Sequence, residues 1–180
     1  PAATAGSAGA SYAGGFKAEG AAAEAVKAGV ASGNIKAVAG AAGEAVIVVK
    51  DGESIQAAVK RAAPGTTFQI LPGNYHETVY IDKDNVRLIG VIDQGRRAVL
   101  DGEGKLNDAI LYSGNNVVVE NLTITKYKGN GIMGQAGNNF EIRNNVIVDT
   151  GVYGIFPQLG QNGVVEHNVV SKIADAAIYV

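Results

Sequence analysis

A repeat of 23 residues runs through the C-terminal half of the chain and constrains its fold more than any other feature. Gly114, Gly137 and Gly160 are separated by two steps of 23 residues. The same step relates four further columns: Asn116, Asn139 and Asn162; Val119, Ile142 and Val165; Ile124, Ile147 and Val170; and Ile132, Ile155 and Ile178. Because five columns share one period, we infer that the chain is built from copies of one structural unit.

Each copy of the repeat has the pattern of β-strands joined by turns. Apolar and polar residues alternate, as in Phe140-Glu141-Ile142-Arg143, which is typical of a strand. Residues 23 apart share their chemistry, as expected when equivalent strands stack directly at a spacing of about 4.8 Å. The glycine and the asparagine two residues later form a turn signature that tolerates left-handed backbone. Leucine-rich repeats have a similar length but need a Leu-dominated strand, which this sequence lacks. The repeat therefore predicts an all-β, right-handed parallel β-helix with 23-residue coils.

Two segments before the regular repeat are predicted to start the solenoid. Residues 46–49 form an apolar run that is typical of a buried strand. Residues 54–63 have apolar side chains at helical spacing and end at Pro64-Gly65, so we predict a short helix. Asp51 or Ser54 is expected to cap this helix, which is expected to cover the open end of the first coil. Residues 1–44 are mostly Ala and Gly and are interpreted as an N-terminal arm or linker outside the β-helix domain of residues 45–180.

The repeat changes at both ends of the predicted domain. Residues 85–88 match residues 116–119 at an offset of 31 in place of 23, which predicts about eight additional residues between Ile92 and Asn107. The chain stops at residues 177–180, within a strand that copies residues 154–157, and no polar cap follows. A last coil without a cap exposes its interior and unpaired backbone groups. We therefore expect that the β-helix is incomplete and continues in the natural protein, or that its C-terminal coil contacts another chain.

The opening of this domain resembles the pectate-lyase-like right-handed β-helix superfamily. The resemblance rests on residues 51–59, on Ala63-Pro64-Gly65-Thr66 and on Leu71-Pro72-Gly73-Asn74-Tyr75, and it covers residues 46–180. It implies the fold and no single activity, since the superfamily includes polyuronate lyases, polygalacturonases, mannuronan epimerases, phage tailspikes and a periplasmic accessory protein of copper-enzyme maturation. The epimerase-type Asp-Pro-His-Asp motif does not occur in this sequence, so the resemblance transfers no catalytic residue.

Composition argues against several function classes. The chain has 15 Lys and Arg against 17 Asp and Glu, for a net charge of -2, which provides no general attraction for nucleic acid. The longest strongly apolar run, residues 45–49, is too short to insert into a membrane. With no Cys, two His and one Met, neither a cofactor nor a dedicated metal site is expected. The Ala/Gly/Ser-rich opening fits the region after a removed signal peptide, so we predict a secreted or periplasmic protein.

Charged side chains in the predicted rows alternate in sign. The two rows are Glu120, Arg143 and Glu166, and Lys126, Asp149 and Lys172. A retaining glycosidase needs two carboxyl groups about 5 Å apart, and a calcium site needs several carboxylates, but no acidic residues stack at a spacing of 23. Opposite charges on neighbouring strands stabilise pairing, so we interpret both rows as structural. Asn145 and Asn168 also share a column and are expected to form a hydrogen-bonded ladder.

Two groups of residues are candidates for ligand binding. Met133, Phe156 and Tyr179 directly follow inward-facing isoleucines and are expected to point outward, with Gln135 and Gln158 two residues further on the same face. Aromatic rings beside amides suit sugar rings; the alternative is that the Ala-rich arm or a protein partner covers this row.

The second candidate is the adjacent pair Arg96 and Arg97 in the charged insertion. Additions to a solenoid are usual places for function, and two arginines suit a carboxylated sugar. The alternative is an ordinary solvated loop.

These observations predict an exported β-helix scaffold that binds polysaccharide or a protein partner and has no identifiable catalytic site. The alternative is a polysaccharide-active enzyme, similar to polyuronate lyases or epimerases, with its site near residues 92–107 or on coils outside this chain. A third possibility, an accessory protein of metalloenzyme assembly, is disfavoured by the shortage of metal ligands.

Overall fold

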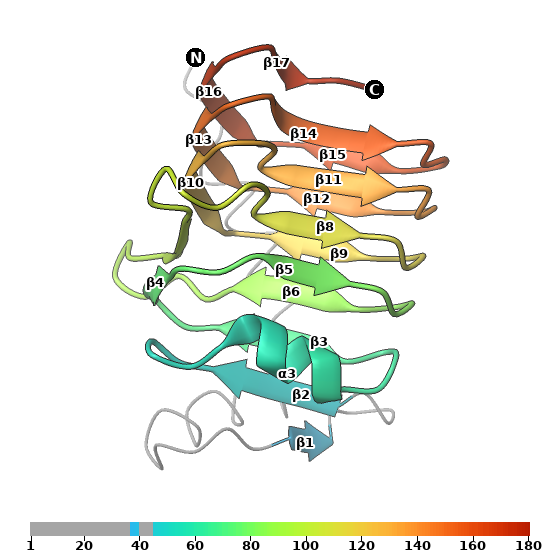
Figure 1. Ribbon diagram of the computed structural model, residues 1–180. Coiled ribbons are helices and arrows are strands. Elements are labelled where there is room, and N and C mark those ends of the chain that lie inside the picture. The colour runs from blue at the N-terminus through green and yellow to red at the C-terminus, as the bar shows by residue number, and fades with distance from the viewer. Residues whose placement is uncertain (1–36, 40–44) are drawn as a thin grey trace, which may run out of the picture.

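The chain forms a parallel β-solenoid with three sheets along its length (Figure 1). The computed structural model describes residues 37–39 and 45–180. Sheet A consists of β1 (Ala37–Ala39), β2 (Ala45–Val49), β3 (Thr67–Ile70), β6 (Arg87–Gly90), β9 (Val118–Glu120), β12 (Glu141–Arg143) and β15 (Val164–Glu166). Sheet B consists of β4 (Gly73–Tyr75), β7 (Ala98–Asp101), β10 (Thr123–Tyr127), β13 (Val146–Thr150) and β16 (Val169–Ile173). Sheet C consists of β5 (Val79–Ile81), β8 (Ile110–Tyr112), β11 (Ile132–Gln135), β14 (Tyr153–Gln158) and β17 (Ala176–Ile178). The predicted right-handed parallel β-helix is confirmed.

The strand registers reproduce the columns read from the repeat. Ile155 pairs with Ile132 on one side and with Ile178 on the other. Ile142 likewise pairs with Val119 and with Val165. These side chains stack along the interior, and Ile132, Ile142 and Ile155 are completely buried. Removing each such side chain from water contributes roughly 1.5–3 kcal/mol, so the repeated aliphatic column supplies much of the driving force for coil stacking.

The glycine and asparagine columns have different structural causes. Asn116, Asn139 and Asn162 have φ of 56°, 55° and 56°, the left-handed region that asparagine tolerates. The glycines provide space: a Cβ atom on Gly137 would lie 2.4 Å from the carbonyl oxygen of Gly114 in the preceding coil. Each copy of the turn therefore needs glycine for close backbone approach and asparagine for its backbone conformation.

A buried asparagine ladder ties the coils together at the corner between sheets A and B. Asn145 is completely buried, and its Oδ1 accepts a hydrogen bond from the backbone N–H of Leu122 at 3.0 Å. Its Nδ2 donates to the carbonyl oxygen of Val119 at 3.0 Å and to Oδ1 of Asn168 at 3.1 Å. The expected stacking of Asn145 on Asn168 is confirmed, and it satisfies backbone groups that the turn would leave unpaired.

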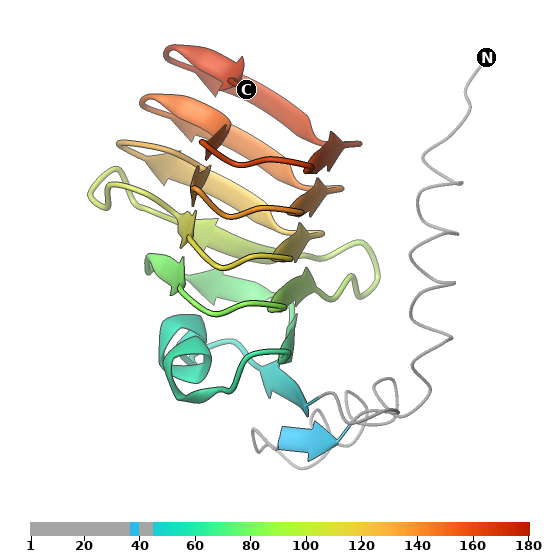
Figure 2. The same cartoon turned by 90° about the vertical axis from the view of Figure 1, so that its right-hand side faces the viewer.

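The helix α3 (Ile55–Arg61) closes the start of sheet C. Ser54, and not Asp51, is the N-cap: its Oγ accepts from the backbone N–H of Ala57 at 3.0 Å. The carboxylate of Glu77, from the next coil, also accepts from the backbone N–H of Ile55 at 2.7 Å. Ile55, Ala58 and Val59 face the core, and Figures 1 and 2 show α3 beneath β5, where a strand of sheet C would otherwise stand. The predicted capping helix is confirmed.

Sheet A begins with an antiparallel pair, β1 against β2, whereas the other strand pairs among the described residues are parallel. Ala37 pairs with Ile47, and Ala39 pairs with Ala45. The remaining residues of the predicted N-terminal arm, 1–36 and 40–44, lie outside the described residues, so the interpretation of residues 1–44 as an arm stays a prediction.

The predicted insertion occupies two places in one coil. Arg87 pairs with Val118 at an offset of 31, Val99 with Thr123 at 24, and Ile110 with Ile132 at 22. Seven additional residues (31 − 24) therefore lie between β6 and β7, and two (24 − 22) lie between β7 and β8. One residue fewer before β9 restores the regular offset of 23 and accounts for the net excess of eight.

Candidate binding face

The outer face of sheet C carries a continuous row of apolar side chains, which we call the apolar row. Its members are Tyr80, Leu111, Met133, Phe156 and Tyr179, one from each of five successive coils. The first four are paired strand to strand, and the backbone N–H of Tyr179 donates to Ile155 at 3.0 Å. The row is accessible: Tyr80 is 40% and Tyr179 51% exposed, and the other three side chains are half-buried.

The sequence predicted Met133, Phe156 and Tyr179 in this row but missed Tyr80 and Leu111. These two residues stand 31 and 22 positions from their neighbours, so a fixed step of 23 passes over them. Realigning the coils on their inward aliphatic residues would have found both.

Amide and hydroxyl groups lie beside three of the five members of the apolar row, two residues further along the chain. Gln135 pairs with Gln158, and both side chains are exposed and make no hydrogen bond to any residue that the structure describes. Ser113 follows β8 in the same direction, and its Oγ lies 3.0 Å from the Oη of Tyr80. The predicted arrangement of amides next to apolar side chains is therefore present on one face.

Three aromatic rings gather at the C-terminal end of this face. The ring of Tyr179 stacks on Tyr153, with centroids 5.3 Å apart and an interplanar angle of 18°. Phe156 contacts both rings, at 4.8 Å from Tyr153 and 5.1 Å from Tyr179. Burial and the neighbouring carboxylate of Asp175 raise the pKa of Tyr153, so its hydroxyl remains a hydrogen-bond donor at neutral pH. Tyr153 stands between Asn130 and Ala176 in its column, so no repeated aromatic residue indicated it in the sequence.

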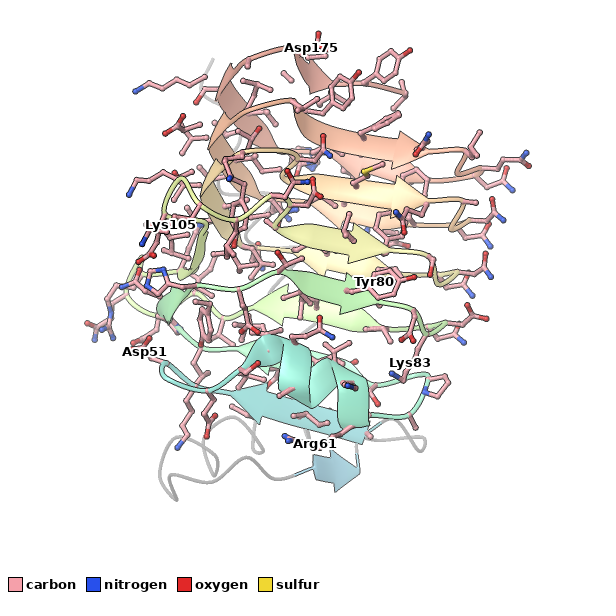
Figure 3. All side chains as sticks on the ribbon, viewed as in Figure 1. Asp51, Arg61, Tyr80, Lys83, Lys105 and Asp175 are labelled. Carbon is pink, nitrogen blue, oxygen red and sulfur yellow. The ribbon has the colours of Figure 1, made fainter. Side chains whose placement is uncertain are left out.

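Sheet C has no charged residue in any of its five strands. The charges nearest to it in sequence are mostly acidic, with Asp82 after β5, Asp108 before β8 and Asp175 before β17. The amine of Lys83 already has partners, since it donates to the carbonyl oxygen of Val59 at 3.2 Å and to Asp82 at 3.2 Å. Figure 3 shows Tyr80 on this face, with Lys83 beside the C-terminal end of α3.

The charge row of sheet A is stacked as the sequence indicated. Arg143 pairs in register with Glu120 and Glu166, and its Nε lies 2.9 Å from Oε1 of Glu166. A second ion pair joins Arg143 to Glu141 at 3.0 Å. Glu120 instead accepts from Nδ2 of Asn144 at 3.1 Å, and burial raises its pKa despite the neighbouring arginines. This row is a network of structural contacts on sheet A, whereas the apolar row lies on sheet C.

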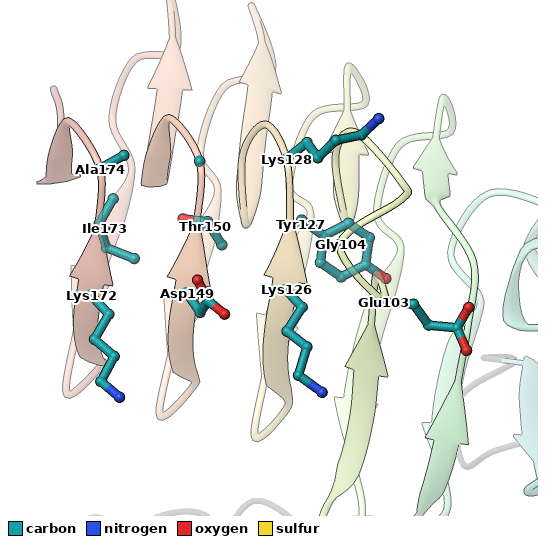
Figure 4. Close-up of a pocket in the computed structure, with 11 residues that line it drawn as sticks. Glu103, Gly104, Lys126, Tyr127, Lys128, Asp149, Thr150, Lys172, Ile173 and Ala174 are labelled. Carbon is teal, nitrogen blue, oxygen red and sulfur yellow. The ribbon is translucent and has the colours of Figure 1, made fainter.

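A hollow of about 450 Å³ follows the second charge row, where sheet B turns toward sheet C (Figure 4). Lys126, Asp149 and Lys172 line it side by side, as the sequence predicted. The ion pair of Lys126 is not with Asp149, however, but with Asp101 of the insertion at 3.1 Å.

His76, Asp101 and Glu103 form a charged cluster beside this hollow. Nδ1 of His76 lies 3.1 Å from the carbonyl oxygen of Asp101 and 3.7 Å from Oε1 of Glu103. Burial acts to raise the pKa of Asp101, but hydrogen bonds from the backbone N–H of Glu103 and from Lys126 outweigh it and lower the pKa. A hydrogen bond from Lys105 lowers the pKa of Glu103. Both carboxylates are therefore ionised at neutral pH, and neither is suited to act as a general acid.

The two predicted arginines occupy a separate corner, between β6 of sheet A and β7 of sheet B. Arg96 forms an ion pair with Asp93 at 2.6 Å. Arg97 donates to the backbone carbonyl of Asn144 at 2.7 Å. Both also line a hollow of about 400 Å³ together with Asn74. The structure thus does not bring the arginines to the apolar row, and binding of a carboxylated sugar by this pair stays a prediction.

Comparison with known proteins identifies the fold class alone. Residues 97–180 match the family model described as the right handed beta helix region. No curated protein and no solved structure matches the chain. Together with the observed coils, the family match makes this chain a generic right-handed β-helix repeat protein.

No helix in residues 37–39 and 45–180 has the length and apolar character to span a membrane. Within the same residues, no group of three or more His, Asp or Glu side chains is arranged to hold a metal ion.

Proposed function

We propose that this chain is an exported β-helix scaffold that binds polysaccharide along the outer face of sheet C. The observation that supports the proposal is the apolar row with hydrogen-bonding side chains beside it. Pyranose rings have apolar C–H faces and hydroxyl edges, so they match an aromatic surface bordered by amides. Because Gln135 and Gln158 lack partners within the described residues, their donors and acceptors are available to sugar hydroxyls.

A role in binding, and not in catalysis, follows from the chemistry of this face. The five strands of sheet C contain no Asp, Glu, His, Lys or Arg, so they offer no carboxyl, imidazole or amine group as a general acid or base. Hydrolysis of a glycosidic bond usually needs two carboxyl groups on opposite sides of that bond. The face therefore holds a polymer without cleaving it.

Replacement of Phe156 by Ser tests this proposal. Phe156 contacts both neighbouring aromatic rings but is only half-buried, so its loss should weaken polysaccharide binding about tenfold with little change in folding stability. Affinity electrophoresis in gels that contain soluble polysaccharides measures the binding, and thermal unfolding measures the stability.

Val148→Ser is the matched control. Val148 is a half-buried outward residue of the same coil, but it lies on sheet B between Thr125 and Ser171, so serine suits its column. Equal binding by Phe156→Ser and Val148→Ser would contradict the proposed face. A loss of several kcal/mol of stability in Phe156→Ser would place its side chain in the core.

A polyuronate lyase is the second candidate, and the charged cluster favours it. Such a lyase needs a base near the C5 proton of a uronate and cations that neutralise the uronate carboxylate. His76 and Lys126 have the required chemistry and are brought to the same cluster by Asp101 and the insertion. Incubation with polyuronates, with and without Ca²⁺, followed by ultraviolet detection of unsaturated ends, distinguishes the two functions. Products that disappear in His76→Ala would establish catalysis and contradict a purely binding role.

A further inference from the structure

We propose that the polymer bound by sheet C is an uncharged, extended glycan that runs parallel to the solenoid axis with one sugar unit on each coil. This inference rests on the proposed binding face and adds its ligand class and orientation.

The charges around the face select against an acidic polymer. The five strands of sheet C have no cation, and Asp82, Asp108 and Asp175 border them. Lys83 is the cation closest to Asp82 in the sequence, and its amine donates to that carboxylate and to the carbonyl oxygens of Val59 and Lys60 in α3. A uronate on this face would gain no ion pair and would approach carboxylates of its own charge, which raises the free energy of its complex. An uncharged sugar meets neither penalty.

The shape of sheet C sets the direction of the polymer. Its strands have only three to six residues and end in turns, whereas five strands follow one another along the axis. The apolar row and the pair Gln135–Gln158 both run in that axial direction. A glycan that lay along the strands would leave the face after a few residues, so only the axial direction lets several sugars contact the row.

The spacing of the row matches that of an extended glycan. Successive coils rise by about 4.8 Å, and the Phe156 and Tyr179 rings are 5.1 Å apart. This interval is close to the length of one pyranose unit in an extended β-1,4-linked chain. Each ring of such a chain can therefore lie over one member of the row, while the amides of Gln135 and Gln158 reach hydroxyl groups at the same interval.

Two hollows elsewhere on the protein differ from sheet C in charge. The hollow beside Arg96 and Arg97 and the hollow beside Lys126 have cations, and neither is lined by a residue from the strands of sheet C. If an acidic glycan bound this protein, it would favour those places. The ligand proposed for sheet C is therefore uncharged, whereas a ligand of the two hollows would be acidic.

The first stage of the test is a panel of neutral oligosaccharides with the full chain. Hexamers of β-1,4-linked glucose, mannose, xylose and N-acetylglucosamine are titrated by calorimetry against wild type, Phe156→Ser and Val148→Ser. At least one should bind wild type and Val148→Ser, with about tenfold weaker binding to Phe156→Ser. Affinity should change little between low and high NaCl, since no ion pair forms.

The second stage changes charge and length separately. Cello-oligosaccharides are compared with their C6-oxidised forms, which have the same backbone and one carboxylate on each oxidised unit. We expect at least tenfold weaker binding of the oxidised form, and recovery of part of that loss in Gln135→Arg. Affinity should rise from the dimer to the tetramer or pentamer and then level off, because the row has five members. If another panel member binds better in the first stage, its dimer-to-hexamer series and its carboxylated form replace these probes.

The outcomes separate this inference from the function on which it rests. Binding of acidic and neutral forms with equal affinity, still lost in Phe156→Ser, would overturn the uncharged ligand class and leave glycan binding standing. An affinity that stops rising at the dimer would overturn the axial orientation. Failure of every glycan to bind, or capture of a protein through Phe156 alone, would overturn both the inference and the proposed function.

Discussion

Loss of the Asn145 side chain should be among the most damaging single changes to this fold. The amide of Asn145 is completely buried and joins two backbone groups of the preceding coil to Asn168 of the next coil. In Asn145→Ala, the N–H of Leu122 and the carbonyl of Val119 would lose these partners in the interior. No other corner residue within the described coils combines complete burial with side-chain hydrogen bonds to both neighbouring coils.

The expected cost of Asn145→Ala follows from the groups that it leaves unpaired. A buried donor or acceptor without a partner costs about 1–3 kcal/mol, so two backbone groups together cost about 2–6 kcal/mol. The third bond adds less, because Oδ1 of Asn168 still accepts from the backbone N–H of residue 145. The middle of this range, about 4 kcal/mol, corresponds to a fall in Tm of roughly 10 °C for a domain of this size.

Thermal and urea unfolding followed by circular dichroism measure this change. Asn168→Ala is the matched control, because Asn168 has the equivalent position in the last coil but is only half-buried, so water can replace its partners. We expect the control to cost about 1 kcal/mol. The reasoning is refuted if Asn145→Ala unfolds within 2 °C of wild type, or if Asn168→Ala is the more damaging of the two.

Three further changes test the stacking of the coils and the charge row of sheet A. Arg143→Glu should be about 1 kcal/mol less stable than Arg143→Ala, because it places like charges beside Glu120 and Glu166; equal Tm values would show that the row is not stacked. Burial raises the pKa of Glu120 in the folded chain, so the wild type loses stability as pH rises through that pKa, and Glu120→Gln should be the more stable protein at pH 7 but not at pH 3. The same Tm difference at both pH values would contradict this assignment. Gly137→Ala should cost about 1–3 kcal/mol, because its Cβ would lie 2.4 Å from a carbonyl oxygen of the preceding coil; a stability unchanged from wild type would mean that the coils are not this close.

The sequence alone determined the architecture, because a solenoid repeats its chemistry wherever it repeats its geometry. Ile132 and Ile155 are 23 residues apart since each must fill the same interior position, and Ile178 keeps this register in β17 although it is 45% exposed in the last described coil. The capping helix was also predictable, because a helical apolar period and the Ser54 cap are local properties of the chain. Outward residues of the regular coils, Phe156 among them, could be assigned to a face by the same argument.

Only the tertiary structure decided where the residues of the irregular coil lie and which residues they contact. Offsets of 31, 24 and 22 within that coil bring Tyr80 and Leu111 into the apolar row, although neither fits the repeat. The insertion directs Arg97 to a carbonyl of another coil and brings Asp101 to Lys126, so neither contact could be read from adjacent residues. The conformation of an added loop depends on long-range partners that no periodic pattern encodes, whereas the position of a repeated strand depends on the strand beneath it. The scaffold could therefore be predicted from the sequence, whereas the full membership of the apolar row required the tertiary structure.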